Sequence, residues 1–218
     1  HDPSEAAIQG LKELLADAGA QACDVQELLH GSTIAANALI QRRGAKTALI
    51  TTRGFRDVLF IQRQDRTTVY DMFYVKPAPL VSRDFVFELN ERMGADGEPI
   101  TSLDETQALA LADELVALGV ESVAVCLLHA YANAAHELQL MNILADRAPN
   151  LRVSLSSQVA PEHREYERTS TTVIDAFVGP AVERYLQHYG EQAQALGYAR
   201  TALIMQSNGG VVPLDRAR

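Results

Sequence analysis

The residues best suited to chemistry begin at His30. An apolar run ends there, and Gly31, Ser32 and Thr33 follow, directly before a segment whose apolar residues recur with helical spacing. Free backbone N–H groups at a helix start, a small glycine and two hydroxyls form a natural seat for a phosphate or a carboxylate. A hydroxyl residue at this position is also an ordinary helix cap. The pattern therefore predicts either an anion site or a cap.

Two arginines three residues apart, Arg63 and Arg66, mark a second candidate site. They lie in a stretch between residues 55 and 80 that has no clear periodicity, near Gln64 and Tyr70. Guanidinium groups present planar, paired donors that match a carboxylate. The pair is therefore a candidate clamp for a substrate carboxylate, and the alternative is a solvated loop.

The densest polar cluster of the chain lies between residues 158 and 172. It contains Glu162, Arg164 and Arg168, and it ends in the consecutive hydroxyl residues 169 to 172. Acidic residues in a first helical turn interact favourably with the helix dipole, which gives the glutamates a structural role. The hydroxyl residues are poor helix formers, so they indicate either packing against a neighbouring backbone or contact with a ligand.

A fourth candidate follows the last predicted strand, in the order Ser207, Asn208, Gly209 and Gly210. Paired glycines after an apolar strand let the backbone approach a ligand closely, and they equally allow a sharp turn. Both interpretations stay open for this segment.

The sequence shows no set of residues with the spacing of a metal site. Cys23 and Cys126 lie far apart, and Cys126, inside a continuous apolar run, is expected to be a small buried residue. His129 and His136 are seven residues apart, but His129 is expected to precede the helix that carries His136. A metal shared by these histidines is therefore not expected.

The elements that must position these residues alternate along the chain. We predict an α/β fold with mixed, largely parallel sheets flanked by helices, because strands and helical segments follow one another closely. Ligands of such sheets bind at the carboxyl ends of the strands, where most of the candidate residues fall. The longest buried strands are expected around Leu49, Val125 and Ile204. Helices are expected over residues 4–18, 34–43, 103–118 with Ser102 as cap, 134–147 and 173–196 with a break at Gly179-Pro180; strands over 46–52, 85–92, 120–128, 151–156 and 201–206.

Composition limits the class of protein. The 218 residues are 47% hydrophobic and 22% charged, which is ordinary for a globular chain with a sizeable core. A net charge of −9 and the absence of a basic cluster argue against nucleic acid and anionic membranes as partners. No signal-peptide pattern and no membrane-length apolar run occur, so a cytoplasmic location is expected. Neither end has the character of a domain edge, which suggests a piece of a longer polypeptide.

Taken in order, the motifs of this sequence resemble the N-terminal part of the hydantoinase A/5-oxoprolinase family, which includes subunits of acetone-type carboxylases. The resemblance spans nearly the whole chain, and Ser32 and Ala36 depart from it, since threonine is common at both positions. The motifs are residues 30–33 with 37–39, Thr51 to Val58, Arg63-Gln64, Tyr70-Asp71, Glu162 to Arg168 and Met205 to Gly210.

The resemblance implies an ATPase fold of the actin, Hsp70 and sugar-kinase type, with residues 1–198 as an N-terminal domain and 199–218 as the start of the next. It implies an ATP-dependent cyclic-amide hydrolase that phosphorylates a carbonyl oxygen to open hydantoin or 5-oxoproline. The alternatives are a ketone carboxylase subunit and a non-catalytic scaffold of the same fold. ATP and Mg²⁺ are expected in the full-length protein, together with a small-molecule substrate and a hydantoinase B-like subunit or domain.

The resemblance also implies roles for the candidate residues. The family's Asp-rich, Gly-Gly-Thr phosphate loop would precede this chain, so the fragment alone is expected to be inactive and to hold no tightly bound nucleotide. The loops after His30, Thr52 and Gln206 are expected to border one cleft, with residues 162–168 on its wall. The expected roles are catalytic for His30 and Thr33, nucleotide-binding for Gly31, Ser32, Ser207, Asn208, Gly209 and Gly210, and substrate-binding for Arg63, Arg66, Glu162, Arg164 and Arg168.

Overall fold

The computed structural model describes residues 3–206 and 209–217, and its chain divides into two compact units. The terminal unit comprises His1–Gln41 and Ala181–Arg218, and the central unit comprises Arg42–Pro180. Each unit has a sheet of its own and is described separately below.

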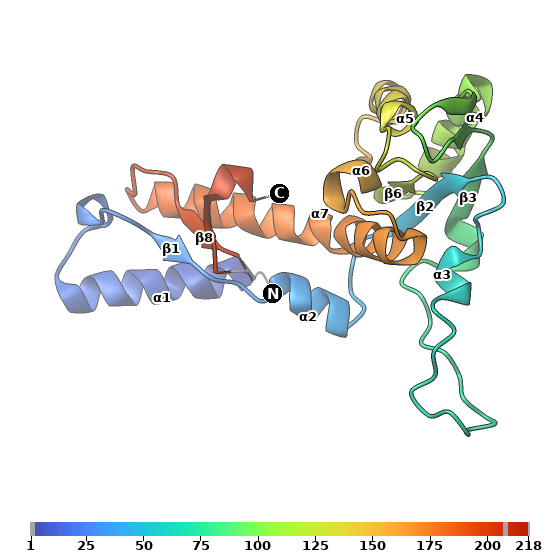
Figure 1. Ribbon diagram of the computed structural model, residues 1–218. Helices are drawn as coiled ribbons and strands as arrows, with labels where there is room; N and C mark the ends of the chain where they lie inside the picture. Colours follow the sequence, from blue (N-terminus) through green and yellow to red (C-terminus); the bar gives the residue numbers. More distant parts are fainter. Residues whose placement is uncertain (1–2, 207–208, 218) are drawn as a thin grey trace. The chain divides into compact units, whose positions relative to one another are not determined.

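The central unit is built on a four-stranded sheet in the order β3-β2-β6-β7 (Figure 1). Its strands are β2 (Thr47–Thr52), β3 (Val86–Leu89), β6 (Ser122–Cys126) and β7 (Arg152–Leu155), and every pairing is parallel. Every residue of β2 and β6 is buried, because these strands lie in the middle of the sheet with helices on both faces. The predicted long strands around Leu49 and Val125 are therefore correct.

Alternate residues of the central strands serve two separate cores. Ile50 and Val125 pack with residues of α4 (Glu105–Ala117) and α5 (Ala135–Arg147) on one face. Leu49 and Ala124 point to the other face and pack against Val173 of α7 (Glu165–Ala195). This alternation follows from the two-residue repeat of a strand.

The ends of the helices and strands depend on local groups. Helix α4 begins at Glu105 rather than Leu103, because Asp104, not Ser102, is its cap and accepts a hydrogen bond from the Gln107 amide at 3.0 Å. The half-exposed strand predicted over 85–92 is shorter, since β3 stops at Leu89. The remaining elements of this unit are α3 (Val58–Ile61), η2 (Arg83–Phe85), the antiparallel pair β4 (Arg92–Met93) and β5 (Pro99–Thr101), and α6 (Ser156–Val159).

The terminal unit carries a small three-stranded sheet in the order β1-β8-β9. Strand β1 runs parallel to β8, and β9 runs antiparallel to it. Ile8 of the first helix packs against Tyr189 and Ala193 of α7 and forms the core of this unit. Its elements are α1 (Pro3–Ala18), η1 (Ala22–Asp24), β1 (Leu29–His30), α2 (Ile34–Ile40), β8 (Leu203–Met205), β9 (Val211–Pro213) and η3 (Leu214–Arg216).

Three sequence predictions about these elements are wrong. The strand around Ile204 is only three residues long and leaves Met205 49% exposed, because its short neighbours form too small a sheet to bury both faces. Helix α2 stops at Ile40, before Arg42 adopts a positive φ of 52°. Helix α7 continues through Pro180, since a proline removes a single N–H donor and packed residues lie on both sides of it.

None of the helices in the described ranges combines the length and the apolar character that a membrane span requires.

Candidate functional site

Buried polar side chains gather where the strands of the central sheet end. The hydroxyl of Thr52, the last residue of β2, donates to Oε1 of Glu91 and accepts a hydrogen bond from the Leu128 amide at 2.8 Å. Oε2 of the same carboxylate lies 2.7 Å from Nδ1 of His136. Since Thr52, Glu91 and His136 are all buried, their polar atoms satisfy one another instead of water.

A second carboxylate, Glu137, is completely buried next to this group. Its Oε1 accepts hydrogen bonds from the Leu127 amide at 3.0 Å and from the Ser156 hydroxyl at 2.6 Å. Nη1 of Arg168 in turn donates to the Ser156 hydroxyl at 2.9 Å and to the Leu127 carbonyl at 2.8 Å. Glu137 and Arg168 are thus connected through the Ser156 hydroxyl and the Leu127 backbone. Because Leu127 follows β6 and Ser156 follows β7, these contacts hold the ends of both strands.

Arg168 also borders a cavity of about 10 Å³, which is room for about one water molecule. Nε of this arginine is buried and has no hydrogen-bond partner among the described atoms. Burial raises the pKa of the Cys126 thiol on the same wall, whose Sγ lies 3.1 Å from the Thr169 hydroxyl. Thr172 donates to the Arg168 carbonyl at 2.7 Å. Two of the hydroxyl residues at positions 169 to 172 therefore make hydrogen bonds inside the protein, as the packing interpretation predicts.

The predicted substrate residues of the central unit lie in different environments. Glu162 and Arg164 are exposed, whereas Arg168 is 1% exposed and bonded internally. Arg63 forms an ion pair with Glu167 at the start of α7. A backbone hydrogen bond is the main cause that lowers the pKa of the Glu167 carboxyl, and the hydrogen bond and positive charge of Arg63 lower it further.

Arg66 lies apart from that ion pair. Its guanidinium is 6.0 Å from the centre of the Tyr74 ring, and its Nη1 is 3.5 Å from the Asp71 carbonyl. The structure therefore pairs Arg63 with Glu167, the residue before Arg168, but it does not place Arg66 in the same group.

His30, in the terminal unit, is held by two tyrosines of α7. Its Nε2 lies 2.6 Å from the Tyr185 hydroxyl, and its ring stacks on Tyr189 with ring centres 4.3 Å apart. Burial lowers the pKa of His30 and raises that of Tyr189. The imidazole is therefore favoured in its neutral form, which can accept or donate a proton.

The residues after His30 make local contacts. Gly31, Ser32 and Thr33 are exposed; the Ser32 hydroxyl accepts from the Ile34 amide at 3.2 Å, and the Thr33 hydroxyl accepts from the Asn37 side chain at 3.2 Å. Helix α2 has only seven residues. Thr33 occupies the cap position of α2 without a side-chain cap hydrogen bond, and Ser32, one residue earlier, bonds the first amide of the helix; a role of either residue toward substrate or nucleotide stays a prediction.

The His30 loop and the last glycine pair leave the same edge of the small sheet, because β1 and β8 are parallel and pair His30 with Ile204. Gly209 has a φ of 82°, and the Gln206 amide donates to the Gly210 carbonyl at 2.8 Å, so a hairpin turn joins β8 to β9. Ser207 and Asn208 lie outside the described residues. A single cleft that also includes the Arg53 turn involves both units and stays a prediction.

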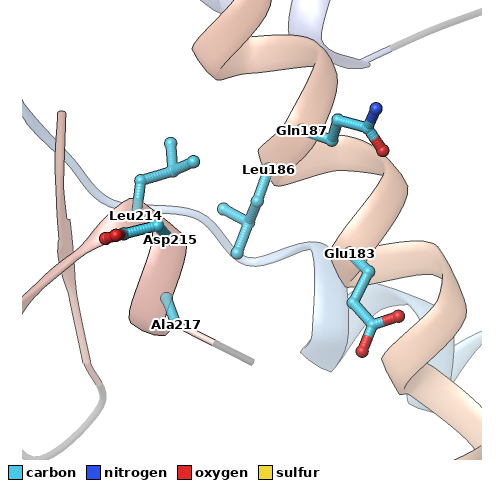
Figure 2. A pocket seen from close by; sticks show the side chains of 6 residues that line it. All are labelled: Glu183, Leu186, Gln187, Leu214, Asp215 and Ala217. Carbon is cyan, nitrogen blue, oxygen red and sulfur yellow. The ribbon is translucent and has the colours of Figure 1, made fainter. Parts of the chain in front are cut away.

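The terminal unit also contains a cavity of about 460 Å³ (Figure 2). Glu183, Leu186 and Gln187 of α7 form one side, and Leu214, Asp215 and Ala217 form the other. No pattern in the sequence marks these residues, because leucines and acids at helical spacing occur on any half-buried helix.

The described residues contain no group of three or more histidine, cysteine, aspartate or glutamate side chains that could hold a metal.

Sequence patterns missed several of the residues that the structure joins. The sequence patterns do not single out Glu91, Glu137, Ser156, Tyr185 or Tyr189, although Ser156 is the last residue of a predicted strand and Glu137 lies in the first turn of a predicted helix. Position at a strand end or a helix start was the only available signal, and it is shared by many residues without a special role.

Known proteins resemble this chain over nearly its full length. Caprolactamase subunit alpha of Pseudomonas jessenii is 32% identical over 92% of this chain, 5-oxoprolinase 1 of Arabidopsis thaliana is 31% identical over 88%, and the acetophenone carboxylase gamma subunit of Aromatoleum aromaticum is 28% identical over 95%. The chain spans only 28%, 16% and 31% of these relatives' lengths.

Two solved structures share the fold. The ATP-dependent caprolactamase from Pseudomonas jessenii superimposes with a TM-score of 0.88 and 31% identity, over 97% of this chain and 32% of that one. Nucleotide-free acetone carboxylase gives a TM-score of 0.80 at 24% identity, over 92% of this chain and 30% of that one, which shows the fold alone. The predicted α/β fold, with a parallel sheet flanked by helices and shared with ATP-dependent enzymes, is confirmed.

Two family models cover most of the sequence. Residues 1–148 match the hydantoinase/oxoprolinase N-terminal region, and residues 168–218 match the hydantoinase/oxoprolinase domain. The chain therefore belongs to the hydantoinase/oxoprolinase family, as the motifs predicted.

Proposed function

We propose that this chain is the N-terminal part of an ATP-dependent enzyme that opens cyclic amides. The observation that most supports the proposal is the likeness to ATP-dependent caprolactamase, which combines sequence identity with a shared fold over almost the whole chain. The relationship to 5-oxoprolinase 1 points to the same substrate class. In this proposal residues 1–198 form the N-terminal domain and the protein acts in the cytoplasm.

The chemistry explains why such a substrate needs ATP. An amide carbon is a poor electrophile and its nitrogen a poor leaving group. Transfer of the γ-phosphoryl group to the carbonyl oxygen, with release of ADP, activates the carbon; one water then opens the C–N bond and a second releases phosphate. The enzyme's task is positioning and charge stabilisation.

The chain's own residues would serve this reaction at two places. His30, neutral at physiological pH because burial lowers its pKa, and Thr33 would act near the reacting oxygen. Arg63, whose ion-pair partner Glu167 lies in the first turn of α7, would bind a substrate carboxylate, with Arg66, Glu162, Arg164 and Arg168 as further proposed substrate residues. Gly31, Ser32 and the segment from Ser207 to Gly210 would approach the nucleotide.

A ketone carboxylase subunit is the second candidate, supported by the relationship to the acetophenone carboxylase gamma subunit. Activation of a ketone oxygen by phosphorylation needs the same positioning, so the fold serves either reaction. A scaffold subunit without catalysis is the third.

Substrate-dependent ATP turnover distinguishes these candidates. The full-length protein, assembled with its hydantoinase B-like partner, is assayed for ADP release with caprolactam, hydantoin or 5-oxoproline, and with acetone or acetophenone plus bicarbonate. We expect a cyclic amide to raise ADP release and to yield the ring-opened product in proportion. Stimulation by ketone and bicarbonate alone would identify a carboxylase, and no stimulation by any substrate would favour the scaffold.

A further inference from the structure

The loop between α3 and η2 exposes a contiguous set of large apolar side chains. We call residues 62–79 the docking loop and residues 69–75 its tip. In the tip, Tyr70, Met72, Phe73 and Val75 are 95%, 91%, 88% and 84% exposed. Figure 1 shows the docking loop projecting from the central unit beyond α3. Single exposed apolar residues are common, but a contiguous group marks an interaction surface.

The stem of the docking loop is held in place by polar contacts, while none of the described residues covers the tip. The two ends of the loop, which form the stem, are bonded to each other, to the neighbouring backbone, or to α7. The contacts are Gln62 Nε2 to the Pro77 carbonyl at 3.1 Å, Lys76 Nζ to the Ile61 carbonyl at 2.7 Å, Arg42 to the Ala78 and Pro79 carbonyls at 2.5 and 3.3 Å, and the Arg63–Glu167 ion pair. A fixed stem lowers the conformational entropy that binding must remove.

The backbone of the tip is also organised. Oδ1 of Asp71 accepts a hydrogen bond from the Phe73 amide at 2.8 Å, and Arg66 lies over the Tyr74 ring. This turn occupies one oxygen of the Asp71 carboxylate and the Phe73 amide, while the large apolar side chains of the tip stay exposed. Tyrosine, methionine, phenylalanine and arginine are the residue types that are enriched at protein interfaces.

Charge indicates what kind of surface the tip fits. Asp65 and Asp71 accompany the basic residues of the loop, and the chain as a whole carries a net charge of −9. The basic residues of the docking loop lie in its stem, whereas the only charge within the tip is the Asp71 carboxylate, which opposes insertion of the tip into lipid. A concave apolar groove on another protein, rimmed by polar groups, suits the tip better.

The relatives indicate which protein supplies that groove. Two of them are named as subunits, and this chain spans 28% and 31% of their lengths, against 16% of 5-oxoprolinase 1. The 5-oxoprolinase is therefore nearly twice as long as the subunits, which leaves room in it for a second subunit fused to the first. The subunit-length relatives need that component as a separate chain.

We propose that the tip of the docking loop inserts into an apolar groove of the hydantoinase B-like subunit or domain. The inference rests on the proposed function for the identity of the partner, and it adds the surface that binds it. The tip side chains are the anchors, and the stem contacts hold them in the orientation for binding.

Binding affinity tests the proposal. The double variant Tyr70→Ser/Phe73→Ser is made in the full-length protein and titrated with the hydantoinase B-like polypeptide. We expect its Kd to rise about tenfold or more. The matched control is Ile100→Ser, which removes an apolar side chain that is 70% exposed on β5 of the same unit and should change Kd less than about twofold. A double variant that binds like the unaltered protein would overturn the proposal.

Oxidation of Met72 by hydrogen peroxide tests which chain covers the tip. We expect rapid oxidation in the isolated full-length protein and protection in the complex. Protection before the partner is added would mean that the protein's own chain covers the tip, and binding of the tip to phosphatidylserine vesicles would mean a membrane contact; either result contradicts the proposal. A complex that forms through the tip but gives no amide-dependent ADP release would contradict the proposed function and leave the docking surface intact.

Discussion

Nδ1 of His136 lies 2.7 Å from Oε2 of Glu91, and the other oxygen of that carboxylate accepts a hydrogen bond from Thr52. These three side chains come from the start of α5, the segment after β3 and the end of β2. One buried carboxylate therefore holds three elements of the central unit together at the carboxyl edge of its sheet. Its removal leaves polar groups without partners in a site that water does not reach.

Glu91→Ala should strongly destabilise the protein. The change removes the acceptor for the Thr52 hydroxyl and for His136, and loss of one partner from a buried pair costs about 3–5 kcal/mol. Urea denaturation followed by circular dichroism measures the free energy of unfolding. Glu114→Ala, an exposed position on α4, is the control and should change it by less than about 0.5 kcal/mol. Equal urea midpoints for the two variants would contradict the buried role of Glu91.

Arg168→Ala should destabilise far more than Arg164→Ala. Arg168 is buried and donates to the Leu127 carbonyl and the Ser156 hydroxyl, whereas Arg164 is exposed four residues earlier. We expect a loss of about 3–5 kcal/mol for the first variant and less than about 0.5 kcal/mol for the second. Thermal unfolding of both variants checks the difference. If both arginines matter only for substrate KM, the structural role assigned to Arg168 is wrong.

His30 should titrate below the ordinary histidine value of 6.5, because burial lowers its pKa. Between the two values the unfolded chain binds more protons than the folded chain, so stability falls as the pH drops from 6.5 to the folded pKa. NMR titration of the His30 ring proton, assigned with His30→Asn, measures the shift. In Tyr185→Phe the pKa should stay low, since the ring remains stacked on Tyr189. A value above 6.5 would show that the ring is not buried as described.

Gly44→Ala and Gly10→Ala should have opposite effects on stability. A Cβ at Gly44 would overlap the Phe177 ring and its carbonyl oxygen, which accepts a hydrogen bond from the Ala45 amide at 2.9 Å. Overpacking of this kind costs about 1–3 kcal/mol. A Cβ at Gly10, inside α1, meets open space and should stabilise by about 0.5–1 kcal/mol. Differential scanning calorimetry of the two variants gives the signs directly.

Arg63→Ala in the full-length enzyme should raise KM with little change in kcat, if Arg63 binds a substrate carboxylate equally in the ground and transition states. Glu167→Gln removes the ion pair but keeps the guanidinium, so it should leave KM nearly unchanged. Steady-state kinetics with 5-oxoproline, which carries a carboxylate, and caprolactam, which does not, make the comparison. Equal KM changes for both variants would assign Arg63 to positioning of α7 instead.

Local patterns were sufficient to predict the central sheet. The continuous apolar runs around Leu49 and Val125 correspond to β2 and β6, whose residues are buried on both faces, because a run of this kind is stable only between two layers of helices. Local patterns failed at Ile204 and Pro180. Burial of a strand depends on the size of its sheet, and tolerance of a proline depends on packing along the helix. Both are set by residues distant in sequence, so a local pattern does not contain them.

The sequence by itself determined the parallel α/β architecture, the family and the strand ends where polar groups collect. Only the tertiary structure decided which of those groups meet. His30 bonds to Tyr185, 155 residues away, and Glu91 bonds to His136, 45 residues away. A buried donor must find an acceptor once water is excluded, and folding chooses that acceptor by bringing distant elements together.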